Sequence, residues 1–408
     1  MGVTELQVSP IHGHCDAAFG AVEAAFRENF VSRDEVGAAV CVLVDGRVVV
    51  DLWGGHHDRE QSRPWQRDTL VNAYSVGKGL TAMLVLGLVE RGELDLDAPI
   101  SGLWPAFAAE GKGEVTLRTL LSHRGGLPGV RGTLAPDAMF SWETMCDALA
   151  GQAPYWVPGT AHGYHVNTFG FLVGEPVCRR LGVDFASAFR ECLAGPRGAD
   201  FGFGLPRGDH RRVAPIVEAS VMETRPLASG DRRELARRSF GVDDDEACAL
   251  LADVYFNPSG LSGVGVVNTA PWRSASIPST NGHGTARGVA ALYDVFMRLD
   301  PKDGGIVGPG LREEATSTFS EGQDRVLGKP SRFGLGLQLS QPSRLVGGSD
   351  SAYGHFGYGG TLGFADPQSG VAFGYLMNRP GDRWQTPRTH ALVEALYASL
   401  GERDGGTS

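Results

Sequence analysis

A serine and a lysine three residues apart are the side chains that most clearly suggest covalent chemistry. Ser75 and Lys78 precede an apolar stretch, residues 80–89, whose composition predicts a helix. Positions i and i+3 of a helix share one face, so the hydroxyl and the amine would be neighbours. Serine becomes a strong nucleophile when a nearby base takes its proton, and a desolvated lysine can be that base. The alternative is a helix-capping serine followed by a solvated lysine.

A tyrosine is the second candidate for proton transfer. Tyr164 follows the turn sequence Pro-Gly-Thr at residues 158–160. A phenol can share protons with Lys78 as a general base if positive charge nearby lowers its pKa from about 10. The alternative is a tyrosine that only packs at the start of a predicted helix, residues 168–181.

A glycine-rich segment, residues 353–360, is the third candidate. Its sequence is Tyr-Gly-His-Phe-Gly-Tyr-Gly-Gly, and so many glycines let a backbone approach a ligand closely. The amides of Tyr358 and Ser75 would together form an oxyanion hole, which stabilises the negative oxygen that develops during acyl transfer. The alternative is a glycine-rich entry into a strand, with His355 at the surface.

Two histidine pairs have spacings that occur in metal sites. They are His56-His57 and His162-x-x-His165. The sequence places no third ligand beside either pair, and solvated histidines in turns explain both more simply. We therefore expect neither a metal ion nor an organic cofactor.

The elements that would position these residues begin with a β-hairpin. Two runs rich in β-branched residues, 38–44 and 48–53, flank the turn sequence Asp45-Gly46. Further strands are predicted late in the chain, at residues 333–340, 361–366 and 370–377. The pattern predicts an α/β fold in which an antiparallel sheet, assembled from both ends of the chain, is flanked by helices.

The middle of the chain predicts mostly helices. We expect them at residues 115–122, 140–150, 168–181, 184–193 and 244–254. The segment 195–269 is rich in Gly, Pro, Arg and Asp, which predicts a long functional loop region or lid. The chain would then consist of a discontinuous sheet domain, residues 1–95 and 270–408, and an inserted helical lobe, residues 96–269.

Composition and charge limit the partners. Hydrophobic residues make up 42% and charged residues 21% of the 408 residues, as in globular enzymes. The net charge of −10, without a basic run, argues against nucleic acid. The most apolar run is too short for a membrane span, and residues 1–14 lack a signal-peptide pattern. We expect a cytoplasmic protein with free thiols and a small-molecule substrate, in an oligomeric state that the sequence leaves open.

Three motifs together resemble the active site of the serine β-lactamase and penicillin-binding-protein superfamily. They are Ser75-Val-Gly-Lys78, Tyr164-His-Val166 and His355-Phe356-Gly357, in the same order and spacing. The resemblance is strongest to the class C β-lactamase-like branch, which includes the family VIII carboxylesterases. Residues 120–128 agree, because they resemble that branch's LLSHTSGL segment. The resemblance covers roughly residues 20–398 and implies a β-lactamase/transpeptidase-like fold.

The resemblance also implies a role for each motif residue. Ser75 would be acylated, while Lys78 and Tyr164 transfer protons and the amides of Ser75 and Tyr358 bind the oxyanion. The serine would attack an ester or amide carbonyl, the leaving group would depart, and water or another acceptor would take the acyl group. The residues expected to contact the substrate are Val166, Asn167, His355, Phe356 and Gly357.

Two departures from the β-lactamase pattern bear on the substrate. Class C β-lactamases have Tyr-x-Asn as second motif, whereas here Val166 takes the third position and Asn167 follows one residue later. The lysine that attracts a substrate carboxylate in the third motif is replaced by His355, which is mostly neutral near pH 7. We therefore favour a carboxylesterase with an acyl-serine intermediate. The alternatives are a transacylase of secondary metabolism, then a β-lactamase or D-aminopeptidase, and last an inactive binding protein.

Overall fold

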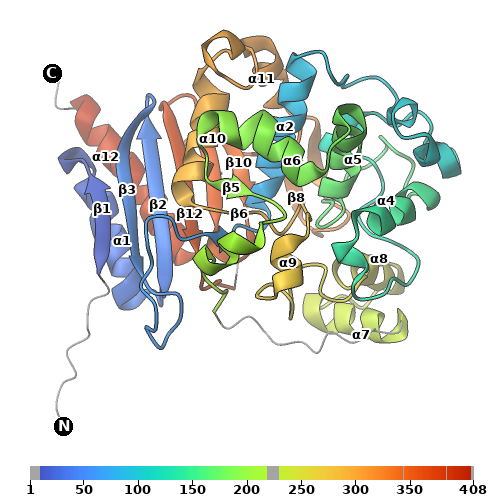
Figure 1. Cartoon of the computed structure of the whole chain (residues 1–408), viewed down its shortest axis with the longest axis horizontal. Helices are drawn as coiled ribbons and strands as arrows, with labels where there is room; N and C mark the ends of the chain where they lie inside the picture. The colour runs from blue at the N-terminus through green and yellow to red at the C-terminus, as the bar shows by residue number, and fades with distance from the viewer. Residues whose placement is uncertain (1–9, 218–228, 343, 383, 406–408) are drawn as a thin grey trace.

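A nine-stranded antiparallel sheet forms one half of the molecule in a computed structural model that describes residues 10–217, 229–342, 344–382 and 384–405 (Figure 1). The strand order is β1-β3-β2-β12-β11-β10-β9-β8-β7. The strands are β1 (Ile11–Cys15), β2 (Gly37–Val44), β3 (Arg47–Gly55), β7 (Ser320–Gln323), β8 (Pro330–Phe333), β9 (Gln338–Leu339), β10 (Tyr353–Phe356), β11 (Leu362–Asp366) and β12 (Val371–Met377). Both ends of the chain contribute strands, which confirms the predicted assembly.

The two ends meet where β2 pairs with β12, and both faces of the sheet are covered there. Val40 and Val42 of β2 belong to a core beneath α1 (Gly20–Ser32) and α12 (Pro387–Gly405). The alternate residues Cys41 and Leu43 belong to the core on the opposite face, which includes α10 (Ala286–Arg298) and α2 (Val76–Glu90). Successive side chains of a strand point to opposite faces. A strand covered on both faces therefore reads as an apolar run.

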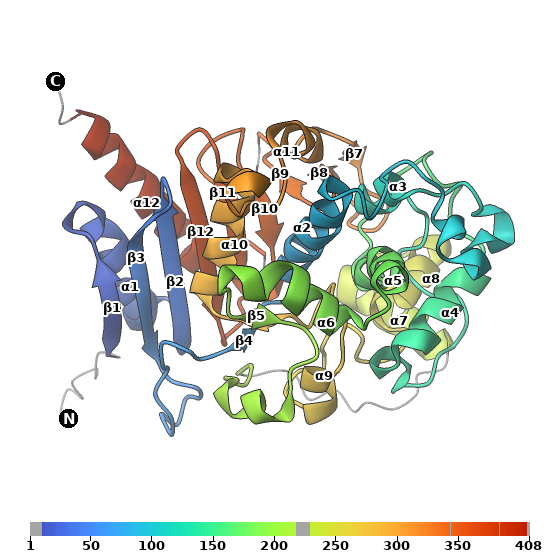
Figure 2. The same cartoon turned by 45° about the horizontal axis from the view of Figure 1, so that its top comes forward.

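The remaining helices gather on the side of the sheet that is away from the two termini (Figures 1 and 2). They include α3 (Leu117–Leu121), α4 (Trp142–Gly151), α5 (Phe169–Leu181), α6 (Phe185–Phe189), α7 (Ser229–Phe240), α8 (Asp245–Tyr255) and α9 (Ala270–Ser274). The buried helix α2 lies between the sheet and this helical group, in contact with β10 and α5. The division into domains at residues 95 and 270 stays a prediction.

A small second sheet brings distant segments to the start of α2. Its strands are β4 (Val71–Asn72), β5 (Phe201–Gly202) and β6 (His283–Gly284), in the order β4-β6-β5. Asn72 pairs with His283, and Ala73 N–H donates to the carbonyl of Gly282 at 2.7 Å. The residues just before Ser75 therefore run beside the segment that precedes α10.

The predicted strand at residues 333–340 is wrong as a single element. Strand β8 ends at Phe333 and β9 begins at Gln338. Between them Gly336 has a φ of +74°, and a Cβ at Gly334 would lie 2.2 Å from the carbonyl oxygen of Ala315. Leucines 335 and 337 are both buried in the turn, so their alternation with glycine imitates a strand pattern.

Two more predictions need correction. The expected long loop region 195–269 contains helix α7 as well as the predicted α8, while residues 218–228 lie outside the described part of the chain. Half of the residues of α7 are charged, and its sequence gives little apolar periodicity. The glycine-rich segment around His355 includes strand β10, which pairs with β11 and β9 inside the sheet. His355 is accordingly buried, so its interpretation as a surface histidine is wrong.

Candidate active site

Ser75 follows a strained turn between β4 and α2. The turn residue Tyr74 has a φ of +50°, a left-handed conformation that bulky residues rarely adopt. Such conformations cost on the order of 1–3 kcal/mol and cluster at functional sites. Ser75 takes the N-cap position of α2 without a side-chain capping hydrogen bond, and it lines a cavity. Its alternative interpretation as a helix-capping serine is therefore wrong.

Lys78 is completely buried beside Ser75. Its Nζ lies 2.9 Å from Oγ of Ser75 and 2.8 Å from the carbonyl oxygen of Ser279. Burial disfavours the ammonium form and lowers the pKa of Lys78 well below 10.5. A neutral amine at this distance is able to accept the serine proton. The alternative of a solvated lysine is wrong.

The phenol of Tyr164 lies against the same amine. The centre of its ring is 4.8 Å from Nζ of Lys78, and its hydroxyl oxygen is 3.5 Å from Nε2 of His355. Burial of the whole side chain raises the pKa of Tyr164 well above 10, although a hydrogen bond with Ser75 opposes this shift. The lowered pKa expected of a phenolate base is therefore not found. Burial therefore favours the protonated phenol and the neutral amine.

His355 contacts the hydroxyl of Tyr164. Its Nδ1 donates to the carbonyl of Phe356 at 2.7 Å, which leaves Nε2 to accept the hydroxyl of Tyr164. Burial lowers the pKa of His355 to about 3, and the nearby Lys78 contributes to the shift. The imidazole is therefore neutral near pH 7 and is no replacement for a lysine that attracts carboxylates. His355 does not line the cavity.

The other two residues of the third motif serve packing. Phe356 points to the opposite face of β10, where it belongs to the core that includes Leu362 and Phe364. At Gly357 a Cβ would lie 2.0 Å from Oγ1 of Thr361 and 2.6 Å from the carbonyl oxygen of Ala73. Only glycine lets the end of β10 come this close to the chain ahead of Ser75. Neither residue lines the cavity, so the structure does not support the contact with substrate that was expected of them.

Two residues that line the cavity have backbone amides for which no acceptor is found within the described part of the chain. Among the hydrogen bonds of the described residues, none uses the N–H of Ser75 or of Tyr358. Oγ1 of Thr361 donates to the carbonyl of Ala73 at 3.1 Å, and the rings of Tyr74 and Tyr358 are 5.3 Å apart. These contacts hold the two segments together, and both Ser75 and Tyr358 line the cavity. The arrangement suits a pair of donors for an oxyanion.

Val166 and Asn167 both line the cavity, with different surroundings. Val166 packs against a small apolar cluster that includes Leu251 and Val254 of α8. The amide of Asn167 is buried, and protein groups accept from its nitrogen and donate to its oxygen. Its side chain is therefore engaged within the protein and is not presented to a ligand.

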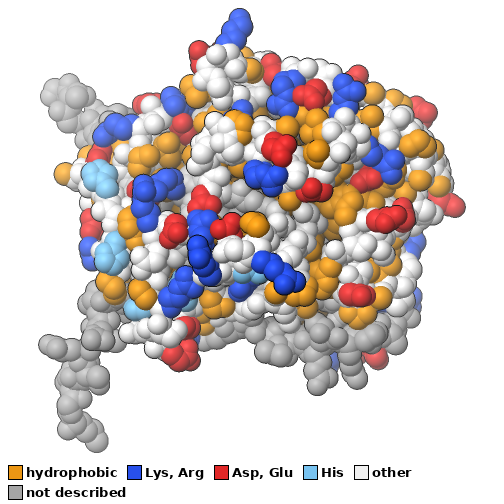
Figure 3. All heavy atoms as spheres, in the orientation of Figure 1, with side chains coloured by type: hydrophobic (Ala, Val, Ile, Leu, Met, Phe, Trp, Pro, Cys, Tyr) orange, Lys and Arg blue, Asp and Glu red, His pale blue; other side chains and the backbone are white. Residues whose placement is uncertain are grey.

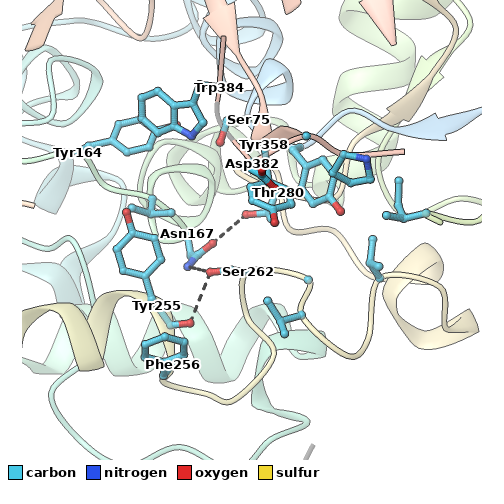
Figure 4. A pocket seen from close by; sticks show the side chains of 18 of the residues that line it. Ser75, Tyr164, Asn167, Tyr255, Phe256, Ser262, Thr280, Tyr358, Asp382 and Trp384 are labelled. Carbon is cyan, nitrogen blue, oxygen red and sulfur yellow. Dashed lines mark hydrogen bonds between the residues drawn. The ribbon is translucent and has the colours of Figure 1, made fainter. Parts of the chain in front are cut away.

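The cavity that Ser75 lines has a volume of about 430 Å³. Figure 4 shows Ser75 and Tyr358 on one side of it and Tyr255 and Phe256 on the other. Most of its lining is aromatic or aliphatic, including Ile216, Val217, Phe240, Tyr255, Phe256, Val264, Val267 and Trp384. This apolar lining was not predicted, because its residues come from separate loops and helix ends that share no sequence motif.

Two charged residues line the cavity as well, Arg379 and Asp382. The guanidinium of Arg379 lies 2.7 Å from the carboxylate of Asp34 and donates to the carbonyl of Pro380 at 3.1 Å. The only arginine or lysine among the described lining residues is therefore already paired.

The family follows from a comparison with known proteins. Residues 22–397 match the model of the Beta-lactamase family, and the chain belongs to that family. This confirms the resemblance drawn from the three motifs and the fold class that it implies.

Individual relatives cover nearly the whole chain. Esterase EstB of Burkholderia gladioli is 38% identical over 425 residues, 97% of this chain and 100% of the relative. Esterase/beta-lactamase LipL of Mycobacterium tuberculosis is 33% identical over 374 residues, 90% of this chain and 83% of the relative. The crystal structure of a family VIII carboxylesterase superposes with a TM-score of 0.82 at 34% identity, covering 96% of this chain and 100% of that one.

The described residues also bear on metal ligation, membrane spans and surface charge. No three His, Cys, Asp or Glu side chains of the described residues are grouped as a metal site. His162 Nε2 lies 3.0 Å from Oγ of Ser331, and His165 lies between the amide of Leu127 and the carbonyl of Gly163. None of the helices in the described ranges is long and apolar enough to cross a membrane. On the face seen in Figure 3, basic side chains are interspersed with acidic ones.

Proposed function

We propose that this chain hydrolyses carboxylic esters through an acyl-Ser75 intermediate. The observation that carries the proposal is the buried amine of Lys78, 2.9 Å from Oγ of Ser75, at the edge of an apolar cavity. One relative is named an esterase and another an esterase/beta-lactamase, and the esterase part of both names supports the same activity. Assignment of the catalytic residues rests on the geometry of this chain.

Acylation begins with attack of Oγ of Ser75 on the ester carbonyl. The serine proton passes to the neutral Nζ of Lys78, whose lowered pKa makes the amine available as a base. Negative charge develops on the carbonyl oxygen, where the amides of Ser75 and Tyr358 act as donors. The carbonyl of Ser279 holds the amine in place through its own hydrogen bond.

Departure of the alcohol requires a proton, and we assign its delivery to Tyr164. Because its pKa lies well above 10, the phenol is protonated and suited to donate to the leaving oxygen. Lys78 then passes the proton that it took from Ser75 to the oxygen of Tyr164. Both groups return to their neutral forms, so charge balances over the step. Water attacks the acyl-enzyme by the same route in reverse and releases the acid.

The charges around the cavity favour neutral esters over substrates with a carboxylate. His355 is neutral and buried, Arg379 is paired with Asp34, and Asp382 adds a negative charge. A β-lactam antibiotic carries a carboxylate that these groups do not attract. The proposed substrates are therefore uncharged esters with apolar acyl or alcohol groups.

The test compares an ester with a lactam on the same enzyme. We expect kcat/KM for p-nitrophenyl butyrate to exceed that for nitrocefin by about 100-fold or more, which corresponds to about 2.7 kcal/mol. Intact-mass analysis after brief exposure to the ester should show one acyl group on Ser75. Comparable turnover of nitrocefin would contradict the substrate class, and acylation elsewhere would contradict the mechanism.

Replacing Tyr164 with phenylalanine tests its role as a proton donor. For ethyl butyrate, whose alkoxide needs a proton, we expect kcat/KM, which reports the acylation step, to fall by about 10²- to 10⁴-fold. The loss in kcat/KM should be much smaller for p-nitrophenyl butyrate, since p-nitrophenolate leaves without protonation. Tyr397→Phe, which removes a hydroxyl bonded to Asp366 away from the cavity, is the matched control. Equal losses for both esters would show that Tyr164 only packs.

Transfer of the acyl group to an alcohol or amine is the second candidate. The apolar, aromatic lining of the cavity favours it, because such walls bind an organic acceptor better than they bind water. The measurement is the ratio of ester to acid product when benzyl alcohol is added. Release of acid alone at high alcohol concentration would leave hydrolysis as the reaction.

A further inference from the structure

The cavity is bounded by two walls that belong to different parts of the chain. One wall carries Ser75, Tyr164 and Tyr358, and the other carries aromatic residues from the ends of α7 and α8. We call residues 229–256, which contain these two helices, the α7–α8 hairpin. In Figure 4 Asn167 lies between the two walls.

The buried side-chain amide of Asn167 bonds to the hairpin wall, at Val254, and to the segment that precedes α10, at Thr280. Its Nδ2 donates to the carbonyl of Val254 in α8 at 2.9 Å and to Oγ of Ser262 at 2.9 Å. Its Oδ1 accepts from Oγ1 of Thr280 at 3.0 Å. The side chain is fully buried, and an asparagine amide supplies both the two donors and the acceptor that this position uses.

Thr280 connects this amide to the reactive lysine. It follows Ser279, whose carbonyl oxygen accepts from Nζ of Lys78 at 2.8 Å. The carbonyl of Thr280 also accepts from Nδ2 of Asn72 at 3.1 Å, and Asn72 lies three residues before Ser75. The segment that Asn167 contacts is thus the segment that holds Lys78 and flanks the turn into Ser75.

We propose that Asn167 is a positioning residue that sets the α7–α8 hairpin relative to Lys78 and Ser75, and thereby selects esters with large apolar groups. The inference rests on the proposed ester hydrolysis. Phe240, Tyr255 and Phe256 of the hairpin wall line the same cavity as Ser75, so we expect a large acyl group to contact them while Ser75 attacks its carbonyl. We expect a small acyl group to depend less on that wall. Misplacement of the hairpin therefore penalises large substrates more than small ones.

The experiment replaces Asn167 with leucine, which has a similar shape and forms none of the three hydrogen bonds. We expect the ratio of kcat/KM for p-nitrophenyl octanoate to that for p-nitrophenyl acetate to fall about tenfold, mostly through KM of the octanoate. Asn29→Leu is the matched control, since Asn29 is a buried asparagine that bonds to Arg388 and Arg33 away from the cavity. An unchanged ratio in folded Asn167→Leu would overturn the proposal.

A milder variant covers the case in which Asn167→Leu does not fold. Thr280→Val keeps the shape of the side chain and removes only its hydrogen bond to Asn167. The ratio should fall about threefold, and the two changes combined should have less than the product of their separate effects, because they remove the same bond. An unchanged ratio in Thr280→Val, or independent effects in the double variant, would overturn the proposal. Wild-type protein that is not acylated on Ser75 would contradict the proposed function instead.

Discussion

Ser75→Ala should lower kcat for p-nitrophenyl butyrate by about 10⁵- to 10⁶-fold, to a residual rate set by binding alone. Alanine removes the atom that forms the acyl bond, and no other hydroxyl lies at hydrogen-bond distance from Nζ of Lys78 among the described contacts. The amides of Ser75 and Tyr358 remain, so substrate still binds while covalent chemistry stops. The measurement is steady-state turnover together with labelling by a fluorophosphonate probe.

The control for this change is Ser399→Ala. Ser399 is buried in α12 and its hydroxyl donates to the carbonyl of Ala395. We expect normal turnover and normal labelling in this variant, whereas Ser75→Ala should lose both. Substantial turnover by Ser75→Ala would mean that another nucleophile performs the reaction.

Lys78→Met should reduce kcat by about 10³- to 10⁵-fold while changing the pH dependence of stability. Activity falls because no other group is placed to take the proton of Ser75. Stability changes because the wild-type protein buries an amine that water would keep charged. Methionine fills a similar volume without that cost. Lys112→Met, at a second buried lysine away from the cavity, should leave turnover unchanged.

The sign of the stability effect follows from proton binding. The pKa of Lys78 is lowered in the folded chain, so below 10.5 the unfolded chain binds a proton that the folded chain resists. The contribution of Lys78 therefore makes the free energy of unfolding of the wild-type protein increase as the pH rises toward 10.5. Relative to wild type, Lys78→Met should be most stable at low pH, and its advantage should shrink near pH 10.5. Urea titrations at both ends of this range measure it, and a difference that does not change with pH would contradict a neutral Lys78.

Local spacing explains why part of the site is predictable. Ser75 and Lys78 are one helical turn apart, so their contact depends only on α2 forming. The hairpin β2–β3 is predictable for the same reason, because its Asp-Gly turn and the two runs of β-branched residues that flank it are adjacent in sequence. Tyr164 is a candidate from its own sequence context, but its pairing with Lys78 follows only from the resemblance, since the distance between the two depends on the whole fold.

Long-range contacts explain why the rest is not predictable. The partner of Lys78 is a backbone carbonyl, that of Ser279, which any residue type supplies. The opposite faces of His355 and Phe356 follow from strand β10, whose pairing on both sides within the sheet is a long-range feature that the glycines of this segment do not indicate. Asn167 carried an expectation of substrate contact, but its amide is occupied by groups from residues 254, 262 and 280.

The pairing of β2 with β12 also has a consequence for the order in which the chain folds. These two strands, the third and fourth in the order of the nine-stranded sheet, are about 330 residues apart in sequence. A ribosome adding 5–20 residues per second needs roughly 20–70 s to cover that distance. During this time the β2–β3 hairpin has an apolar edge without its partner, which is a site for wrong pairing. A chain that ends before residue 371 lacks β12, the strand that joins β2 to β11, so shortening it there should cause aggregation and not a smaller folded enzyme.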